Sequence, residues 1–292
     1  MVSGRMTVPV YFDSHMHTPL CKHAIGEPEK YANEALQKGL KGIIFTCHGP
    51  MPAGFWPEVR MSDAQFDEYV AMIELCRLRF EGQLEVLLGI ESDYFPGHEQ
   101  WSEKLHERAP LHYVLGSVHW QGPEYRDQFE TGSAADFRRT YFEHLADSAE
   151  TGLFDCLAHP DLIKNYQPEA WEVEAWTPEI AAALDRIAKT GVAMELNTSG
   201  KNKSFPEMNP APVILRMMHE RGIPVVLGSD SHRPQRVGDS FIPALELVQQ
   251  AGYDAVSVFK HRKRNEIKIA DVLPTLKSDL LVPGKMEPSV IV

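Results

Sequence analysis

Histidine and carboxylate side chains recur directly after short apolar runs along the chain. The first run is followed by Asp13-Ser14-His15-Met16-His17, and the last by Gly228-Ser229-Asp230-Ser231-His232. The runs between them lead to four further residues, His48, Glu91, His119 and His159. Imidazole nitrogens and carboxylate oxygens suit Zn, Mn or Fe, and a carboxylate can bridge two ions. Two or three ions a few Å apart could activate a water and hold phosphoryl oxygens.

The spacing within the first and last motifs supports a shared site. His15 and His17 are two residues apart, as are Asp230 and His232. Alternate residues of an extended segment point to the same side, so each pair can bind one cluster. A single histidine at a strand end is usually a hydrogen-bonded structural residue. Six such residues on six strands indicate a common function instead.

The elements that position these residues alternate along the chain. The predicted strands are Val8–Phe12, Gly42–Thr46, Glu85–Gly89, Tyr113–Ser117, Phe154–Ala158, Val192–Leu196 and Pro224–Gly228. The predicted helices are Pro28–Lys38, Ser62–Phe80, Ala134–Thr151, Pro178–Thr190, Asn209–Arg221 and Ser240–Ala251. Strict alternation predicts right-handed crossovers and a parallel sheet. In such folds the carboxyl ends of the strands converge on one face, where sites are built.

Seven units without a break in composition favour one closed β/α barrel over two domains. A doubly wound open sheet is the alternative, because alternation alone does not show closure. We expect one domain over residues 1–280 and a tail rich in Pro and Val over residues 281–292. Between them lie an apolar run, Ala255–Phe259, and a basic patch, His261–Arg264.

Composition and charge exclude several classes of function. The 292 residues carry a formal net charge of −12, which argues against a protein that coats nucleic acid with a basic face. No apolar run approaches the length of a membrane span, and the N-terminus lacks a signal-peptide core. The four cysteines form no C-x-x-C pair, which predicts reduced, mostly buried thiols in a cytoplasmic protein, with Cys47 and Cys156 packed in the core.

Several longer motifs resemble the PHP (polymerase and histidinol phosphatase) superfamily, and among its members the monofunctional histidinol-phosphate phosphatases. Besides the first and last motifs, the matching pieces are Cys21-Lys22-His23, Gly89-Ile90-Glu91-Ser92-Asp93, Gly116-Ser117-Val118-His119, His159-Pro160-Asp161-Leu162-Ile163-Lys164 and Asn197-Thr198-Ser199-Gly200. The resemblance spans residues 13 to about 263. It implies a distorted seven-stranded β/α barrel with a trinuclear metal site at the C-terminal ends of the strands.

The same resemblance implies a ligand set for Zn, Mn or Fe. One ion would be held by His15, His17, Glu91 and Asp230. Glu91 would bridge to a second ion, completed by His119 and His159. A third ion would be held by His23, His48 and His232, and a compatible residue stands at all nine positions.

The implied reaction is hydrolysis of a small phosphomonoester, with L-histidinol phosphate as the specific hypothesis. A hydroxide held between ions at His15, His17, Glu91 and Asp230 would attack phosphorus directly. Three cations could grip the phosphate, namely Lys201, Lys203 and Arg233. Trp56, Arg60 and Trp120 are weaker candidates for the pocket lining, and Asp161 or the surroundings of His232 for protonating the leaving alkoxide.

The chain departs from those relatives in one loop, because Lys201-Asn202-Lys203 stands where they usually carry an Arg-Lys pair. Lysine binds phosphate without the bidentate fork of arginine, so substrate choice could differ. The alternatives are a phosphatase for another small phosphomonoester, an exonuclease acting on oligonucleotide ends, and a metal-binding protein without turnover. The sequence carries no signal for an oligomeric state.

Overall fold

Seven parallel strands form the centre of the molecule, in the order β1 to β7. The computed structural model describes residues 11–52 and 54–277. The strands are β1 (Phe12–Asp13), β2 (Gly42–Phe45), β3 (Glu85–Asp93), β4 (Tyr113–Ser117), β5 (Cys156–Leu157), β6 (Ala193–Asn197) and β7 (Val225–Gly228). Each strand pairs in parallel with the next along the chain, as the alternation predicts.

The two edge strands meet, so the sheet forms a nearly closed barrel. A parallel bridge joins Met16, just after β1, to Ser231, just after β7. The amide of His17 donates to the carbonyl of Ser231 at 2.9 Å, and the amide of Ser231 donates to the carbonyl of His15 at 3.2 Å. The open-sheet alternative is therefore wrong. The contacts that close the barrel lie within the two predicted ligand motifs, residues 13–17 and 228–232.

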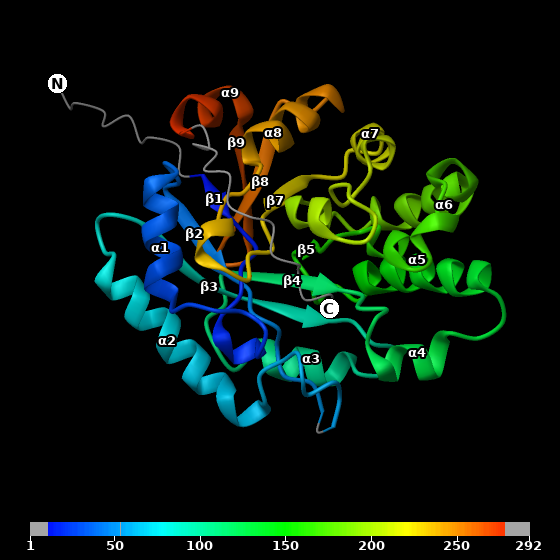
Figure 1. Ribbon diagram of the computed structural model, residues 1–292, viewed down its shortest axis with the longest axis horizontal. Coiled ribbons are helices and arrows are strands. Elements are labelled where there is room, and N and C mark those ends of the chain that lie inside the picture. The colour runs from blue at the N-terminus through cyan, green and yellow to red at the C-terminus, as the bar shows by residue number, and fades with distance from the viewer. Residues whose placement is uncertain (1–10, 53, 278–292) are drawn as a thin grey trace.

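Helices surround the barrel (Figure 1). They are α1 (Pro28–Gln37), α2 (Phe66–Arg79), α3 (Glu99–His106), α4 (Pro123–Phe129), α5 (Ala134–Glu150), α6 (Thr177–Ile187), α7 (Pro212–Glu220), α8 (Phe241–Gln250) and α9 (Ile269–Val272). Local sequence signals explain where several helices begin. Helices α1, α4, α6 and α7 carry proline in the first turn, where the backbone N–H that proline lacks would have no partner within the helix. A capping box of Ser133 and Asp136 opens α5.

The chain after α8 folds as an antiparallel hairpin, β8 (Ala255–Lys260) and β9 (Lys263–Lys268). Val258 and Phe259 pack with the side chains that fill the barrel. The ring of Phe259 stacks on Tyr113, the first residue of β4, with 5.2 Å between centroids. The hairpin therefore closes the N-terminal mouth of the barrel, and the predicted apolar run supplies its buried face.

The predicted elements differ from the structure mainly at their ends. The fifth strand is shorter than predicted, and β3 extends to Asp93, so that Glu91 lies within a strand rather than after one. Helices α3 and α4 were not predicted. Residues 8–10 of the first predicted strand and the predicted boundary at residues 280/281 lie outside the described residues.

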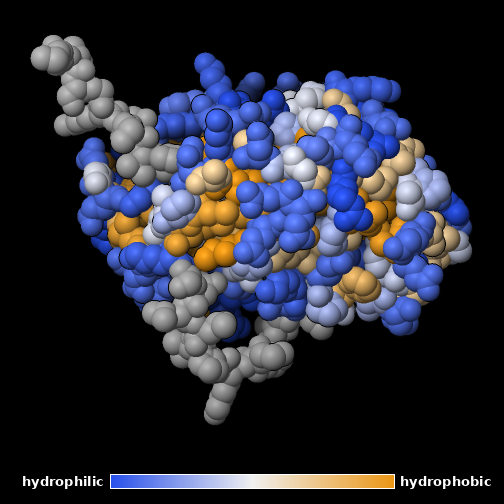
Figure 2. Space-filling view, turned by 90° about the horizontal axis from the view of Figure 1, so that it is seen from above, coloured by the Kyte–Doolittle hydropathy of each residue, from blue (hydrophilic) through white to orange (hydrophobic). Residues whose placement is uncertain are grey.

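Hydrophilic side chains cover most of one face of the molecule. The face shown in Figure 2 is mostly hydrophilic, with apolar side chains gathered in patches between charged ones. Among residues 11–52 and 54–277, no helix combines the length and the apolar character needed to cross a membrane.

Candidate metal centre

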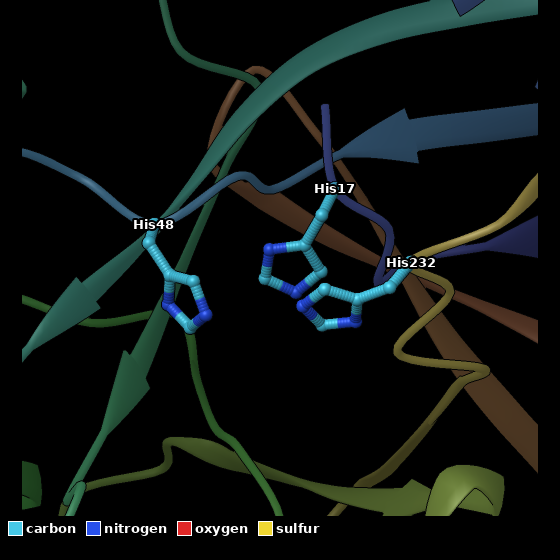
Figure 3. A group of neighbouring side chains, drawn as sticks. All are labelled: His17, His48 and His232. Carbon is cyan, nitrogen blue, oxygen red and sulfur yellow. The ribbon is translucent and has the colours of Figure 1, made fainter. Parts of the chain in front are cut away.

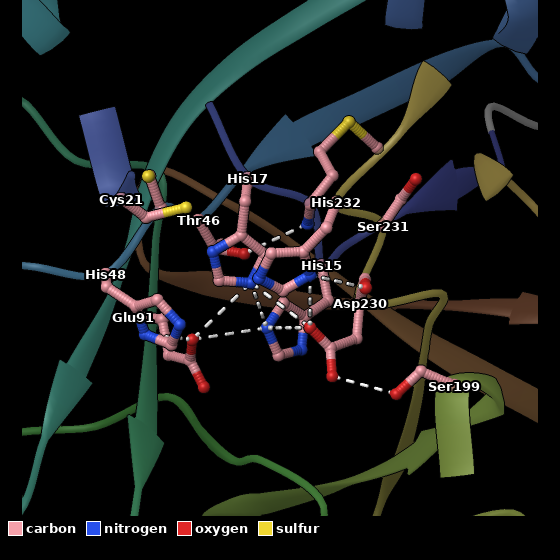
Figure 4. A network of polar contacts seen from close by, with 12 residues as sticks. His15, His17, Cys21, Thr46, His48, Glu91, Ser199, Asp230, Ser231 and His232 are labelled. Carbon is pink, nitrogen blue, oxygen red and sulfur yellow. Dashed lines mark hydrogen bonds and ion pairs between the residues drawn. The ribbon is translucent and has the colours of Figure 1, made fainter. Parts of the chain in front are cut away.

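The predicted ligands meet at the C-terminal mouth of the barrel, around a small pocket. Its lining includes seven of the nine predicted ligands, namely His23, His48, Glu91, His119, His159, Asp230 and His232. His15 and His17 lie beneath them and are fully buried. Figure 4 shows six of the nine, His15, His17, His48, Glu91, Asp230 and His232, converging from segments that are far apart in the sequence.

The donor atoms of His15, His17, Glu91 and Asp230 lie close together at the base of the pocket. The Nε2 atoms of His15 and His17 lie 3.2 Å apart. The Oε2 of Glu91 is 3.4 Å from the first and 3.6 Å from the second. The Oδ1 of Asp230 is 3.6 and 3.2 Å from the same two nitrogens. Ligands at about 2.1 Å from a tetrahedral ion stand about 3.4 Å from one another. The distances among His15, His17 and Asp230, and those from Glu91 to the two imidazoles, are therefore the distances expected between ligands of one ion.

The other oxygen of Glu91 faces a second group. Its Oε1 lies 3.2 Å from the Nε2 of His159 and 3.4 Å from the Nε2 of His119, and it accepts a hydrogen bond from Ser117. Burial opposes ionisation of Glu91, but the surrounding imidazoles hold its pKa well below the usual value. Glu91 is thus a buried carboxylate whose two oxygens each face a separate set of nitrogens, which is the geometry of a bridging ligand.

The remaining histidines are grouped differently from the prediction. The donor atoms of His17, His48 and His232 lie within 4.8 Å of one another (Figure 3). His23 and His232 instead fall into one group with Cys21. In the described part of the chain, no single group contains all of His23, His48 and His232.

Two buried carboxylates that the sequence analysis did not select orient the imidazoles. Glu195, in β6, accepts a hydrogen bond from the Nδ1 of His15 at 2.7 Å and from the amide of His159 at 2.9 Å. Asp93, at the end of β3, lies 3.0 Å from the Nδ1 of His119. A carboxylate on the outer nitrogen directs the lone pair of the inner nitrogen toward a metal ion.

A signal for Glu195 was present in the sequence. It interrupts an apolar strand, Ala193–Asn197, whose residues are all buried, and a charged residue in such a position needs a partner. The contact with His15 also explains Gly228, because a Cβ there would lie 2.0 Å from the Oε1 of Glu195. The motif before Asp230 therefore needs glycine to admit the Glu195–His15 pair.

The backbone is strained at two predicted ligands. Asp230 has a φ of 50° and His159 a φ of 28°, both in the left-handed region that side chains rarely adopt. Hydrogen bonds hold this conformation: Ser199 donates to the Oδ2 of Asp230 at 2.8 Å, and the buried Asp13 accepts from the amide of Ser229 at 3.0 Å. Strain of this kind is concentrated at functional sites.

The electrostatics of the site favour positive charge. Burial opposes a charge on His15, but the carboxylates of Glu195, Asp230 and Glu91 outweigh it and hold the pKa of His15 well above its usual value. Burial likewise opposes a charge on His17, but the hydrogen bond to Asp230 and the charge of Glu91 help raise its pKa to about 9. The cluster thus favours positive charge strongly, and its donor set and spacing fit divalent metal ions.

The three predicted phosphate-binding cations lie in different places. Lys203 lines the pocket, with its Nζ 3.9 Å from the Oδ2 of Asp230. Lys201 donates to the Oγ of Ser240 at 2.9 Å and is not part of the lining. Arg233 begins the turn after β7 and is also not part of the lining.

Of the weaker pocket candidates, only Trp56 contributes to the lining. Arg60 is buried and donates to Asp93 at 2.7 Å, and Trp120 donates from its ring nitrogen to the carbonyl of Leu162 at 3.2 Å. Asp161 is fully buried and bonded to Lys164, Asn209 and the amide of Ala211. It therefore anchors structure and is not available to protonate a leaving group.

Comparison with known proteins agrees with this arrangement. The model of the PHP domain family matches residues 13–199. A protein of Deinococcus radiodurans named "Probable histidinol-phosphatase" is 40% identical over 257 residues, which cover 86% of this chain and 97% of that protein. The histidinol-phosphatase of Bacillus subtilis is 26% identical over 263 residues, covering 80% and 98%.

Among solved structures, the histidinol phosphate phosphatase of Lactococcus lactis, complexed with zinc, L-histidinol and phosphate, has a similar fold. Its TM-score is 0.75 at 20% identity, over 88% of this chain and 99% of that one. The family match covers more than half of the chain, and the Deinococcus relative extends over most of it. This protein belongs to the PHP domain family.

Proposed function

We propose that the protein is a metal-dependent phosphomonoester hydrolase that converts L-histidinol phosphate and water into L-histidinol and phosphate, a reaction of histidine biosynthesis. The observation that carries the metal dependence is the 3.2–3.6 Å spacing of the donor atoms of His15, His17, Glu91 and Asp230. The names of the Deinococcus and Bacillus relatives support the substrate. The cytoplasmic location predicted from the cysteine pattern is part of this proposal.

The proposal assigns two or three divalent ions, Zn, Mn or Fe, to three sets of ligands. The sets are His15, His17, Glu91 and Asp230; Glu91, His119 and His159; and His23, His48 and His232. The distances from the two oxygens of Glu91 support the first two sets, since Oε2 lies near His15 and His17 and Oε1 lies near His119 and His159. When bound, ions at these positions would supply Lewis acidity toward the phosphoryl oxygens and the attacking water.

The protein's own residues would bind and orient the ester. Lys203 is the cation nearest to the ligands at the pocket wall, where its ammonium group would attract a phosphoryl oxygen. Trp56 and Leu162 line the same pocket and would cover the alcohol part of the substrate and exclude water from it. Glu195 and Asp93 would hold the imidazoles of His15 and His119 in one orientation throughout turnover.

Phosphate release from L-histidinol phosphate, measured against a panel of phosphomonoesters and a short single-stranded oligonucleotide, tests the proposal. The enzyme is stripped of metal and restored with Zn, Mn or Fe in parallel. We expect a strong preference for histidinol phosphate that disappears on chelation and returns with metal.

Equal or faster cleavage of generic phosphomonoesters would overturn the substrate but keep the metal chemistry. Preferential cleavage of the oligonucleotide would favour an exonuclease. Tight metal binding without hydrolysis of an aryl phosphate would identify a metal-binding protein without turnover.

A further inference from the structure

Two cysteine thiols lie against the proposed metal centre on the side of His17 that faces away from Asp230. Cys21 ends a short 3-10 helix (Pro19–Cys21), and Cys47 follows β2 and precedes His48. Both side chains are fully buried and unpaired by disulfides. Figure 4 shows Cys21 on the opposite side of His17 from Asp230. The sequence pattern predicted only core packing for Cys47, and the proposed hydrolysis uses neither thiol.

The thiols and one imidazole form a compact set of donors. The Sγ atoms of Cys21 and Cys47 and a ring nitrogen of His17 all lie within 4.8 Å of one another. Sulfur ligands at about 2.3 Å from a tetrahedral ion stand about 3.8 Å apart, which this spacing accommodates. Thr18 donates to the Sγ of Cys47 from its amide at 3.4 Å and its hydroxyl at 3.2 Å, so polar hydrogens already point at this sulfur.

An unpartnered nitrogen completes the set. The Nε2 of His17 faces His15 and Asp230, both at 3.2 Å. Its Nδ1 is buried and has no hydrogen-bond partner, although a buried nitrogen without one is costly. The outer nitrogens of His15 and His119 each face a carboxylate. His17 instead has a buried nitrogen open to a ligand and two thiols close by.

The thiol set adjoins the wall of the pocket. Cys21 forms a second group with His23 and His232, whose donor atoms also lie within 4.8 Å of its Sγ. His23 and His232 both line the pocket. Cys21 therefore belongs both to a group with two residues of the pocket wall and to the buried group with Cys47.

We propose that Cys21, Cys47 and His17 form a binding site for a thiophilic divalent cation such as Cd²⁺ or Zn²⁺, separate from the sites with oxygen and nitrogen ligands alone. Near neutral pH, binding forms two metal–sulfur bonds and one metal–nitrogen bond and releases three protons to solvent, one from each thiol and one from the protonated imidazole of His17; no electrons are transferred. Soft thiolate ligands select such ions over Mn²⁺ or Mg²⁺. Because the proposed function also assigns His17 to the hydrolytic site, occupancy is expected to inhibit hydrolysis, and this consequence alone rests on that function.

Titration of the metal-free full-length protein with Cd²⁺, followed by ultraviolet absorbance, tests the site. Coordination by sulfur produces a thiolate-to-metal charge-transfer band that oxygen and nitrogen ligands do not give. We expect a band that saturates near one equivalent. It should fall by at least half in Cys47→Ser and disappear in the Cys21→Ser/Cys47→Ser double variant. Cys76→Ser and Cys156→Ser are the matched controls, because both thiols are buried away from the site, and both variants should keep the full band.

A second measurement uses the unaltered protein, in case a variant fails to fold. Cd²⁺ should slow alkylation of Cys21 and Cys47, read by mass spectrometry of the peptides, at least tenfold more than alkylation of Cys76 and Cys156. A band that survives in the double variant, or equal protection of all four thiols, would overturn the proposal. Neither measurement needs turnover, so a protein that shows the band but hydrolyses no phosphoester contradicts the proposed function and leaves this site intact.

Discussion

Both mouths of the barrel contain ionisable side chains, but those side chains differ in burial and in the number of charged neighbours. At the N-terminal mouth, the β8–β9 hairpin closes the barrel with apolar side chains, and the charges around it are paired at the surface: Lys260 with Glu85, and Arg262 with Asp155 at 2.5 Å. At the C-terminal mouth, buried imidazoles and carboxylates face one another across a pocket.

The difference shows how to distinguish structural from functional ionisable groups in this fold. Each charged side chain named at the closed mouth is paired with one opposite charge, and three of the four side chains are partly exposed to water. A charge at the open mouth is desolvated and surrounded by several groups, an arrangement that is stable only with a cation in the middle. Residues 13–17 and 228–232 lie at the second mouth because they follow parallel strands, not because they are rich in histidine.

The largest expected effect on kcat comes from a comparison of two glutamates in one strand, one near each mouth of the barrel. Glu91→Gln removes the bridging charge and should lower kcat by about 10³-fold or more, since the metal ions carry most of the charge stabilisation. Glu85→Gln, six residues earlier in β3, should leave kcat unchanged. The measurement is phosphate release at saturating metal and substrate. Equal losses in the two variants would show that strand integrity, rather than position at the mouth, decides activity.

Glu195→Gln tests the carboxylate behind His15. The amide keeps the shape but loses the charge, and the change should weaken metal binding by about 10–100-fold. Competition with a chromophoric chelator measures the affinity. Asp155→Asn, a half-way buried carboxylate at the closed mouth, is the control and should bind metal as the unaltered protein does. An unchanged affinity in Glu195→Gln would remove the proposed orienting role.

Two lysines in the loop after β6 differ in their position relative to the pocket, because Lys203 lines it and Lys201 does not. Lys203→Ala should raise KM about tenfold, because a hydrogen bond to a charged phosphoryl oxygen contributes about 1.5 kcal/mol. Lys201→Ala should change KM little, since that side chain contacts Ser240. Steady-state kinetics of the two variants decide between them. A larger effect at Lys201 would mean that the loop rearranges when substrate binds.

Metal binding at the open mouth should release protons, and the number released should depend on pH. His17 has a pKa of about 9 in the metal-free protein, because Asp230 and Glu91 help outweigh its burial. It therefore keeps a proton at pH 7.5 that an entering ion must displace, and metal affinity should rise as the pH approaches 9. Calorimetry in two buffers of different ionisation enthalpy counts the protons. We expect about one fewer proton released per protein at pH 9.5 than at pH 7.5, and a pH-independent count would contradict this.

The smallest effect belongs to the closed mouth. Arg262 bonds to Asp155 and to the carbonyl of Leu153, and its side chain is about one-third exposed. Arg262→Ala should lower the free energy of unfolding by about 1 kcal/mol or less and leave kcat unchanged. Urea unfolding measures the first and phosphate release the second. Arg264→Ala, which loses only a surface bond to Gly191, should be nearer to neutral. A loss of activity in Arg262→Ala would show that the two mouths are coupled.

Much of the fold and of the candidate site follows from the sequence alone. The alternation of apolar runs with helical patterns fixes the order of the parallel strands, and parallel strands bring their carboxyl ends to one face. The position of His15, His48, His119 and His159 just after strands therefore already indicates their convergence. Lys203 could be selected but not distinguished from Lys201, because a two-residue difference in a turn does not reveal which side chain faces the pocket.

Only the tertiary structure decided which residues are partners. His15 and Glu195 are 180 positions apart, and their contact depends on the closure of the sheet, which brings β6 and β7 round to β1. The same holds for the thiols beside His17 and for the hairpin that closes the N-terminal mouth. Local sequence determines where a strand ends and which face a side chain takes. The distance between two side chains from different strands is set by the curvature and packing of the whole barrel, which no local pattern encodes.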